Sequence, residues 1–110
     1  MSASEAFKQQ LLQLSAEYRA MLPGKLVELD TLWQQLATGA EQPQASRDLL
    51  RELHTLAGSA KTFGFPALSV SAREAEIFLE PFCDKGAMQQ TEDRQTFLRL
   101  LDALRQAAAT

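Results

Sequence analysis

The sequence has 110 residues, of which 45% are hydrophobic and 23% charged, and its net charge is −3. A chain of this length buries a hydrophobic core as one domain without staples, and its single cysteine, Cys83, excludes an internal disulfide and fits a reducing compartment. The mildly acidic balance excludes the electrostatic signature of nucleic-acid or membrane-surface binding. There is no signal-peptide pattern, and no apolar run approaches the roughly 20 residues of a membrane span. We therefore expect a single cytoplasmic domain over residues 1–110.

Helical periodicity runs through the N-terminal third of the chain. The first predicted helix has apolar residues at steps of four, three and four: Phe7, Leu11, Leu14 and Tyr18. A second helix is predicted to open at Leu22 and Pro23, because proline lacks the N–H group that stays unpaired in a first turn. The buried stripe of this second helix is formed by Leu22, Leu26, Leu29, Trp33 and Leu36.

Three further helices are predicted from the same kind of spacing. The third is capped by Ser46, ends before Gly64, and has Leu49, Leu53, Leu56 and Ala60 on its core face. The fourth runs from about Pro66 to Phe82 and buries Leu68, Ala72, Ala75 and Leu79. The last opens at Thr91 and buries Phe97, Leu100, Leu101 and Leu104. No segment alternates with period two, so the expected fold is all-α: an antiparallel four-helix bundle with an additional N-terminal covering helix across one end.

The only histidine, His54, lies on the third predicted helix. At 100° per residue it falls about 140° from Leu49, so it points away from the core. Gly58, one turn later on the same outer face, costs about 1 kcal/mol relative to alanine in a helix interior. An exposed glycine gains no packing inside the protein, so we interpret it as a point of close approach by another molecule. The alternative is an ordinary surface histidine.

Cations share this outer face with the imidazole: Arg47, Arg51 and Lys61. A neutral imidazole has a free lone pair on one ring nitrogen and is a nucleophile. Phosphoryl transfer asks the protein for in-line access and charge compensation. Lys61 lies two turns after His54, and long helical side chains lean toward the N-terminus, so its ammonium group could reach a phosphoryl group on the ring.

The segment "HTLAGSAKTFG", residues 54–64, resembles the signature of histidine-containing phosphotransfer (HPt) domains, H-x-L-K-G followed by small residues and a glycine. The matching residues are His54, Leu56, Gly58, Ser59 and Gly64. The "LP" at Leu22 and the pattern Leu68, Ala72, Ala75 and Glu76 are also similar to the family. The resemblance implies a phosphorelay carrier rather than an enzyme. His54 would exchange a phosphoryl group with receiver-domain aspartates, and the receiver would supply Mg²⁺ and the catalytic groups, so no cofactor is expected on this chain.

One position departs from the family pattern, because Ala57 stands where the family usually has lysine. Lys61 is our first candidate for the missing positive charge, and Arg51 is the second. The small residues expected to allow close approach are Ala57, Gly58 and Ser59. The implied partners are response-regulator receiver domains and a hybrid sensor kinase, docking on Leu50, Ala57 and Phe65 with Arg47, Arg51 and Lys61 at the rim.

Other functions fit the sequence less well. The segment "GSAKT" lacks both P-loop glycines and a preceding strand, and one outward histidine cannot form a metal site in the bundle core. Arg73, Glu74 and Glu76 are assigned to a solvated face, with a role for Arg73 near the histidine left open. The alternative function is an HPt-like adaptor or dimerisation domain of a larger signalling protein, whose histidine is not phosphorylated. For the carrier we expect a monomer.

Overall fold

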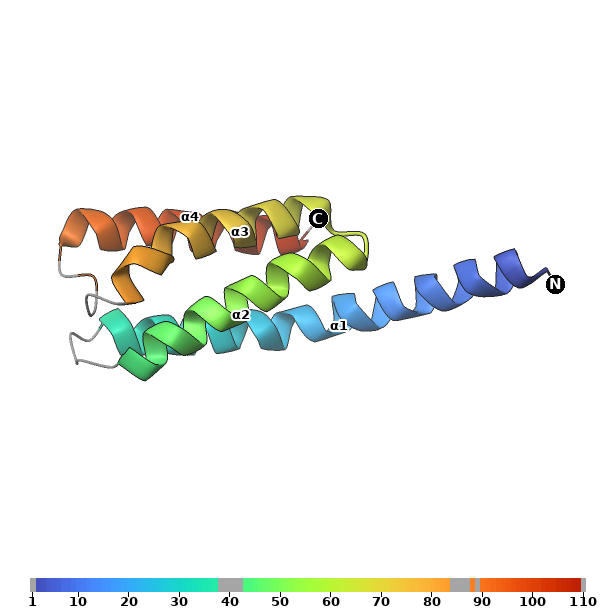
Figure 1. The fold of residues 1–110 in the computed structure, drawn as a ribbon, viewed down its shortest axis with the longest axis horizontal. Helices are drawn as coiled ribbons and strands as arrows, with labels where there is room; N and C mark the ends of the chain where they lie inside the picture. Colours follow the sequence, from blue (N-terminus) through green and yellow to red (C-terminus); the bar gives the residue numbers. More distant parts are fainter. Residues whose placement is uncertain (1, 38–42, 84–87, 89, 110) are drawn as a thin grey trace.

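The computed structural model describes residues 2–37, 43–83, 88 and 90–109. These residues form four helices and no strand: α1 (Ala3–Ala37), α2 (Pro43–Thr62), α3 (Pro66–Cys83) and α4 (Thr91–Ala109) (Figure 1). The all-α class predicted from the sequence is confirmed. None of the described helices combines the length and apolar character that crossing a membrane requires.

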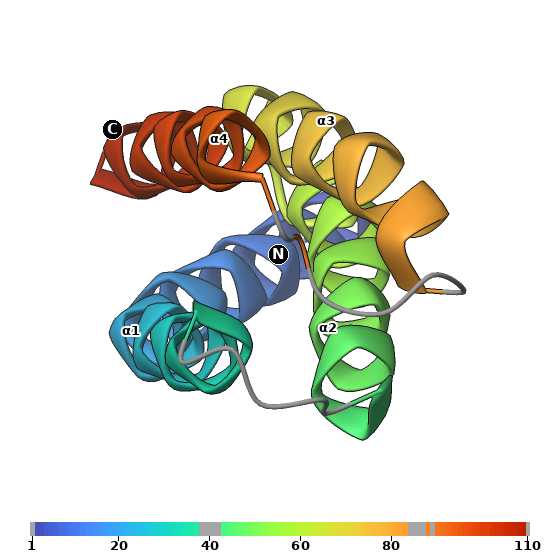
Figure 2. The same ribbon diagram turned by 90° about the vertical axis from the view of Figure 1, so that its left-hand side faces the viewer.

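Each helix of the bundle runs opposite to the one before it (Figure 1). Seen from the end, α1 and α2 lie on one side while α3 and α4 lie on the other (Figure 2). The contacts join α1 to α2, α2 to α3, α3 to α4, and α4 back to α1. The four apolar faces therefore enclose one core.

The centre of the core consists of residues that the helical spacing selected in α2, α3 and α4. The central layers come from α2, α3 and α4, where the largest fully buried side chains are Leu49, Leu53, Leu68, Leu79, Phe97, Leu101 and Leu104. Tyr18 and Trp33 of α1 are also buried, and the Trp33 ring lies 4.9 Å from that of Phe97. Tyr18 and Trp33 thus serve packing, as their places in the apolar stripes predicted.

The prediction of two separate helices before residue 38 is wrong, because α1 is continuous and contains Pro23 in its interior. An interior proline removes one backbone hydrogen bond and costs about 3 kcal/mol, which usually ends or kinks a helix. Here the apolar stripe keeps the same register on both sides of Pro23, from Tyr18 through Leu22 to Leu29. A proline by itself therefore did not mark a helix boundary.

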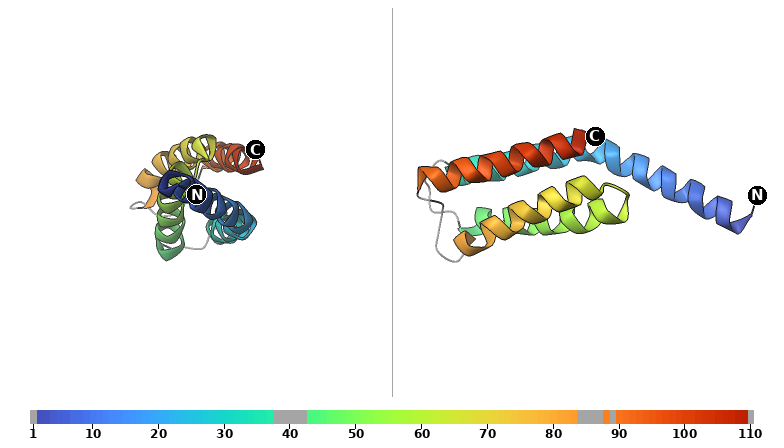
Figure 3. Two further views of the ribbon diagram at one scale, coloured as in Figure 1. Left: turned by 90° about the vertical axis from the view of Figure 1, so that its right-hand side faces the viewer. Right: turned by 90° about the horizontal axis from the view of Figure 1, so that it is seen from above.

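The N-terminal part of α1 does not cover the end of the bundle, which corrects the expected covering helix. It continues as helix, at an angle to the rest of α1, and projects beyond the other helices (Figures 1 and 3). The molecule is accordingly elongated, with extents of 57 × 22 × 20 Å. Three of the side chains expected to be buried in this helix are exposed: Phe7 (65%), Leu11 (40%) and Leu14 (40%).

The turn between α2 and α3 fixes how these two helices face each other. Gly64 has a φ of 88°, a left-handed conformation that glycine adopts without steric cost. The amide of Phe65 donates to the carbonyl of Ala60 at 2.8 Å, and the amide of Gly64 donates to the carbonyl of Lys61 at 3.5 Å. This pair of hydrogen bonds is a Schellman motif, which ends the helix. At its other end α2 begins at Pro43, so Ser46, the predicted cap, is instead buried within the helix.

Candidate functional site

His54 lies in the middle of α2, and α3 runs beside it. Its side chain is 68% exposed, as the helical wheel predicted. One ring nitrogen is nevertheless engaged, because Nδ1 lies 2.7 Å from Oε2 of Glu76 on α3. The imidazole is thus held at one nitrogen and open to solvent over most of its surface.

Glu76 is a buried carboxylate, and its side chain is only 11% exposed. Its second oxygen, Oε1, accepts a hydrogen bond from Nη1 of Arg73 at 3.1 Å. A carboxylate can only accept, so the proton in the bond to His54 belongs to Nδ1. The other ring nitrogen, Nε2, then carries the free lone pair. The pair sets both the tautomer and the orientation of the ring.

A shallow hollow of about 330 Å³ surrounds the histidine on the α2–α3 face. Its lining is formed by His54, Ala57, Gly58, Lys61, Ser69 and Arg73. The hydroxyl of Ser69 donates to the carbonyl of Ala57 at 2.6 Å and ties α3 to α2 beside the hollow. Two cationic side chains, Lys61 and Arg73, therefore border the same depression as the imidazole, which suits an anionic group there.

No steric contact among the described residues requires a glycine at position 58. A Cβ atom built on Gly58 would meet no atom from the rest of the protein within 4 Å. The position is therefore sterically open toward solvent, one turn from His54. Open space above a helical glycine is what close approach by a second molecule needs.

The cations named from the sequence do not all gather at the histidine. Lys61 lines the hollow, as expected. Arg51 instead pairs with Asp48 at 2.7 Å and lines a different hollow, between α1 and α2. Arg47 hydrogen-bonds the side chain of Gln44 at 3.3 Å.

Two other residues named from the sequence lie away from the imidazole. The hydroxyl of Ser59 lies 2.8 Å from that of Tyr18, on the side of α2 that faces α1. Phe65 is 8% exposed, and the guanidinium of Arg19 lies over its ring at 4.8 Å. Among the expected apolar contacts, Leu50 is half-buried against the core and Ala57 is 8% exposed at the floor of the hollow.

Of the residues that α3 contributes, sequence reasoning missed Glu76 and Ser69 and left a role for Arg73 open. Glu76 was assigned to a solvated face, although on a helical wheel it falls only about 80° from Leu68, at the edge of the core stripe. Arg73 and Ser69 lie further out on the same side and reach the hollow. A carboxylate at the border of an apolar stripe was the available signal, and it indicates a group that must find a partner across the interface.

The described residues contain no cluster of three or more histidine, cysteine, aspartate or glutamate side chains that could hold a metal ion. The arrangement is instead one oriented imidazole with a buried carboxylate behind it and cations beside it. These are the features that a histidine nucleophile on the face of a helical bundle would need.

Comparison with known protein families also places the chain in a histidine-carrying class. The family model described as "Hpt domain" matches residues 6–109, nearly the whole chain. The protein belongs to the Hpt domain family. Hpt domains are histidine phosphotransfer carriers of phosphorelays rather than catalytic enzymes, and they interact with receiver domains. No curated protein and no solved structure gives a significant match to the chain.

Proposed function

We propose that this protein carries a phosphoryl group on Nε2 of His54 and exchanges it with receiver-domain aspartates in a multistep phosphorelay. The observation that carries the proposal is the 2.7 Å contact between His54 Nδ1 and the buried carboxylate of Glu76. It leaves Nε2 as the nucleophile on a ring that is 68% exposed. An inert surface histidine gains nothing from a buried carboxylate that fixes its ring orientation.

The transfer step follows from this geometry. The lone pair of Nε2 attacks the phosphorus of an aspartyl phosphate, an N–P bond forms, and the P–O bond to the aspartate breaks. The electron pair of that bond leaves with the aspartate as a carboxylate. The proton on Nδ1 stays in place, so the phosphorylated ring is cationic, and the negative charge of Glu76 stabilises it. Transfer to the next receiver is the reverse of this step.

Charge compensation for the phosphoryl oxygens is the role we assign to Lys61, with Arg73 as a second group. Both line the hollow around His54, where the family's usual lysine is replaced by Ala57. Arg51 is the weaker candidate, because its guanidinium is paired with Asp48 and lines another hollow. Mg²⁺ and the groups that activate the aspartate belong to the receiver.

Docking of the receiver is proposed on the α2–α3 face around Gly58. The open space above Gly58 admits the partner's backbone, and Ala57 and Leu50 offer small apolar contacts. Arg47 and Lys61 remain at the rim, whereas Phe65 and Ser59 are turned toward α1 and are less suited to contact the receiver. An interface of this kind is modest in area and transient.

The test is phosphoryl uptake by the wild-type protein and by a His54→Gln variant. Each is incubated with a small phosphoramidate donor and, separately, with phosphorylated receiver domains. We expect an acid-labile mass increase of one phosphoryl group in the wild type and none in His54→Gln. A folded wild-type protein that no donor loads would contradict the carrier and favour the adaptor.

A further inference from the structure

The first half of α1 forms a helical arm, residues 3–21. Over most of its length, the apolar side of this arm is not covered by any other part of the chain that the structure describes. Its stripe continues the heptad-like spacing of Phe7, Leu11, Leu14, Tyr18 and Met21. Phe7, Leu11, Leu14 and Met21 are 65%, 40%, 40% and 45% exposed, whereas Tyr18, where the stripe reaches the bundle, is 5% exposed and stacks on Phe63. A helix of this length is marginal in water unless its apolar face is covered.

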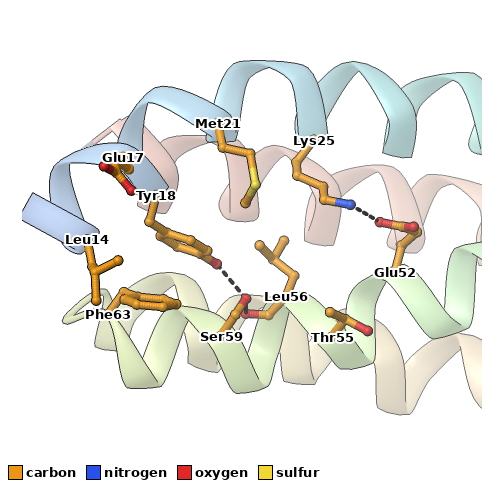
Figure 4. A pocket seen from close by; sticks show the side chains of 10 residues that line it. All are labelled: Leu14, Glu17, Tyr18, Met21, Lys25, Glu52, Thr55, Leu56, Ser59 and Phe63. Atoms are coloured by element: carbon orange, nitrogen blue, oxygen red, sulfur yellow. Dashed lines mark hydrogen bonds and ion pairs between the residues drawn. The ribbon is translucent and has the colours of Figure 1, made fainter.

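Where the arm meets the bundle, the same stripe becomes one wall of a groove. The groove lies between α1 and α2 and has a volume of about 410 Å³ (Figure 4). Leu14, Tyr18 and Met21 form its α1 wall, and Leu56, Ser59 and Phe63 form its α2 wall. At the far end the groove is bounded by the ion pair between Lys25 and Glu52, with Nζ and Oε2 2.9 Å apart. The stripe therefore runs without interruption from the exposed arm into an open apolar groove.

We propose that the occupant of this groove is the arm of a second copy of the chain. Steps of four, three, four and three place Phe7, Leu11, Leu14, Tyr18 and Met21 at the a and d positions of a short coiled coil. In an antiparallel pair, the register that sets Leu11 against the partner's Leu14 also sets Phe7 against the partner's Tyr18. This register is its own two-fold image, so both copies make the same contacts.

The antiparallel pairing covers the apolar side of the arm and occupies the α1–α2 groove at the same time. Each copy offers one arm and one groove, and the register brings the first turns of each arm beside Tyr18 and Met21 at the partner's groove. The arm has two acidic and two basic residues, Glu5, Glu17, Lys8 and Arg19, and therefore no net charge that would repel a second copy. Because the arm is short, the interface is smaller than the roughly 1,600 Å² of a standard one, and dimerisation should depend on concentration in the micromolar range.

This dimer is compatible with phosphoryl transfer. The groove lies on the side of α2 that faces α1, where Ser59 meets Tyr18. His54 lies on the side that faces α3, where it meets Glu76. Two copies joined by their arms would each keep an open histidine, so the proposal replaces only the monomeric state expected from the sequence.

Sedimentation equilibrium over about 5 to 500 µM tests the dimer. We expect the wild-type mass to rise from the 12.2 kDa of one chain toward twice that value. Leu11→Glu places a charge in the centre of the stripe and should raise the dissociation constant at least ~10-fold. Leu12→Glu is the matched control, because Leu12 is 71% exposed and lies off the stripe, and we expect less than a ~3-fold change.

A wild-type mass of one chain at every concentration would overturn the proposal. That is the result expected if the arm instead folded onto the groove of its own chain. Equal effects of the two glutamate variants would do the same. Orientation is tested in a Cys83→Ser background by mixing Leu11→Cys with Leu14→Cys protein under mild oxidation. The antiparallel register predicts the mixed disulfide, whereas predominant Leu11→Cys and Leu14→Cys homodisulfides would show parallel arms and contradict it.

Discussion

His54 and Glu76 face each other across the α2–α3 interface, with Nδ1 and Oε2 2.7 Å apart. The imidazole is mostly exposed, whereas the carboxylate is almost completely buried. A buried carboxylate needs charged or hydrogen-bonding partners, and Glu76 has two, His54 and Arg73. The pair therefore serves the fold and the proposed chemistry at the same time, because the bond that satisfies Glu76 also orients the ring.

Replacing Glu76 by glutamine should slow phosphoryl uptake without unfolding the protein. The glutamine side chain has the shape of glutamate, and its amide oxygen can still accept the hydrogen bond from Nδ1 of His54. The substitution removes the negative charge that stabilises the cationic phosphorylated ring. Losing the charged part of one hydrogen bond corresponds to about 1–1.5 kcal/mol, or roughly tenfold in the uptake rate. The measurement is the initial rate of loading from a phosphoramidate.

Glu74→Gln is the control for this experiment, because Glu74 is an exposed carboxylate on the same helix. Its rate should stay at the wild-type value. ¹⁵N NMR of the ring provides a second readout, since wild-type His54 should show the Nδ1–H tautomer and the Glu76→Gln variant a mixture. Unchanged uptake and an unchanged tautomer in Glu76→Gln would show that the carboxylate has only a structural role.

The positive charge beside the histidine should come from Lys61 more than from Arg51. Lys61→Ala removes a cation that lines the hollow, so the phosphohistidine should form more slowly and decay faster. For one exposed charge the effect is about 0.5–1 kcal/mol, or roughly two- to fivefold in each rate. Arg51→Ala is the matched control, because Arg51 is paired with Asp48. Equal rates for Lys61→Ala and the wild type would refute the assignment.

How far the sequence predicts this structure differs between its elements. The buried stripes predicted for α2, α3 and α4 were correct. Apolar residues spaced every three or four positions lie on one face of a helix, and each of these faces packs on the same core. The contact between His54 and Glu76 was not foreseen, since it depends on how two helices are rotated against each other, and a wheel describes only one. Likewise Ser59, five residues from His54, belongs to the opposite side of the same helix.

The interpretation of Pro23 failed for a different physical reason. Proline is favoured in a first turn and disfavoured in an interior, so local propensity placed a boundary there. The uninterrupted apolar register from Tyr18 to Leu29, with buried side chains on both sides of Pro23, outweighs that local cost. Whether the earlier residues Phe7 and Leu11 pack on their own bundle could not follow from spacing, because exposure depends on what lies opposite.

Gly58→Gln should slow phosphoryl transfer from a receiver without destabilising the fold. A Cβ atom at this position has no neighbour within 4 Å outside its own helix backbone, and glutamine is the better helix former by up to about 1 kcal/mol. The variant should therefore be slightly more stable in urea denaturation and still load from the small phosphoramidate. Transfer from a phosphorylated receiver should fall at least ~10-fold, because the side chain occupies the space that the partner approaches.

Gly58→Ala is the graded control for close approach, since it gains helix propensity with only one added carbon. Its transfer rate should lie between those of the wild type and Gly58→Gln. Receiver transfer by Gly58→Gln at the wild-type rate would mean that the partner does not approach this surface, and the glycine would then need another explanation.

The ion pair that closes the α1–α2 groove predicts a pH dependence of stability. The hydrogen bond from Lys25 to the carboxylate of Glu52 raises the pKa of Lys25 above its usual 10.5, against the smaller opposing effect of burial. A raised pKa in the folded state means that folding favours the charged ammonium. Its contribution is therefore complete below the unfolded pKa of 10.5 and is lost as pH rises through the folded pKa.

Glu52→Gln should accordingly unfold at lower urea concentration than the wild type at neutral pH, by about 0.5–1 kcal/mol for a partly exposed pair. The difference between the two proteins should persist at about pH 9 and shrink as the pH rises through the folded pKa of Lys25, where the ammonium loses its charge. Comparing the two proteins at each pH cancels the titration of other groups. Glu28→Gln, which removes the longer 3.3 Å contact to the same ammonium, should show a smaller difference. A Glu52→Gln deficit that stays constant across this range would mean that the carboxylate stabilises the groove through something other than the charge of Lys25.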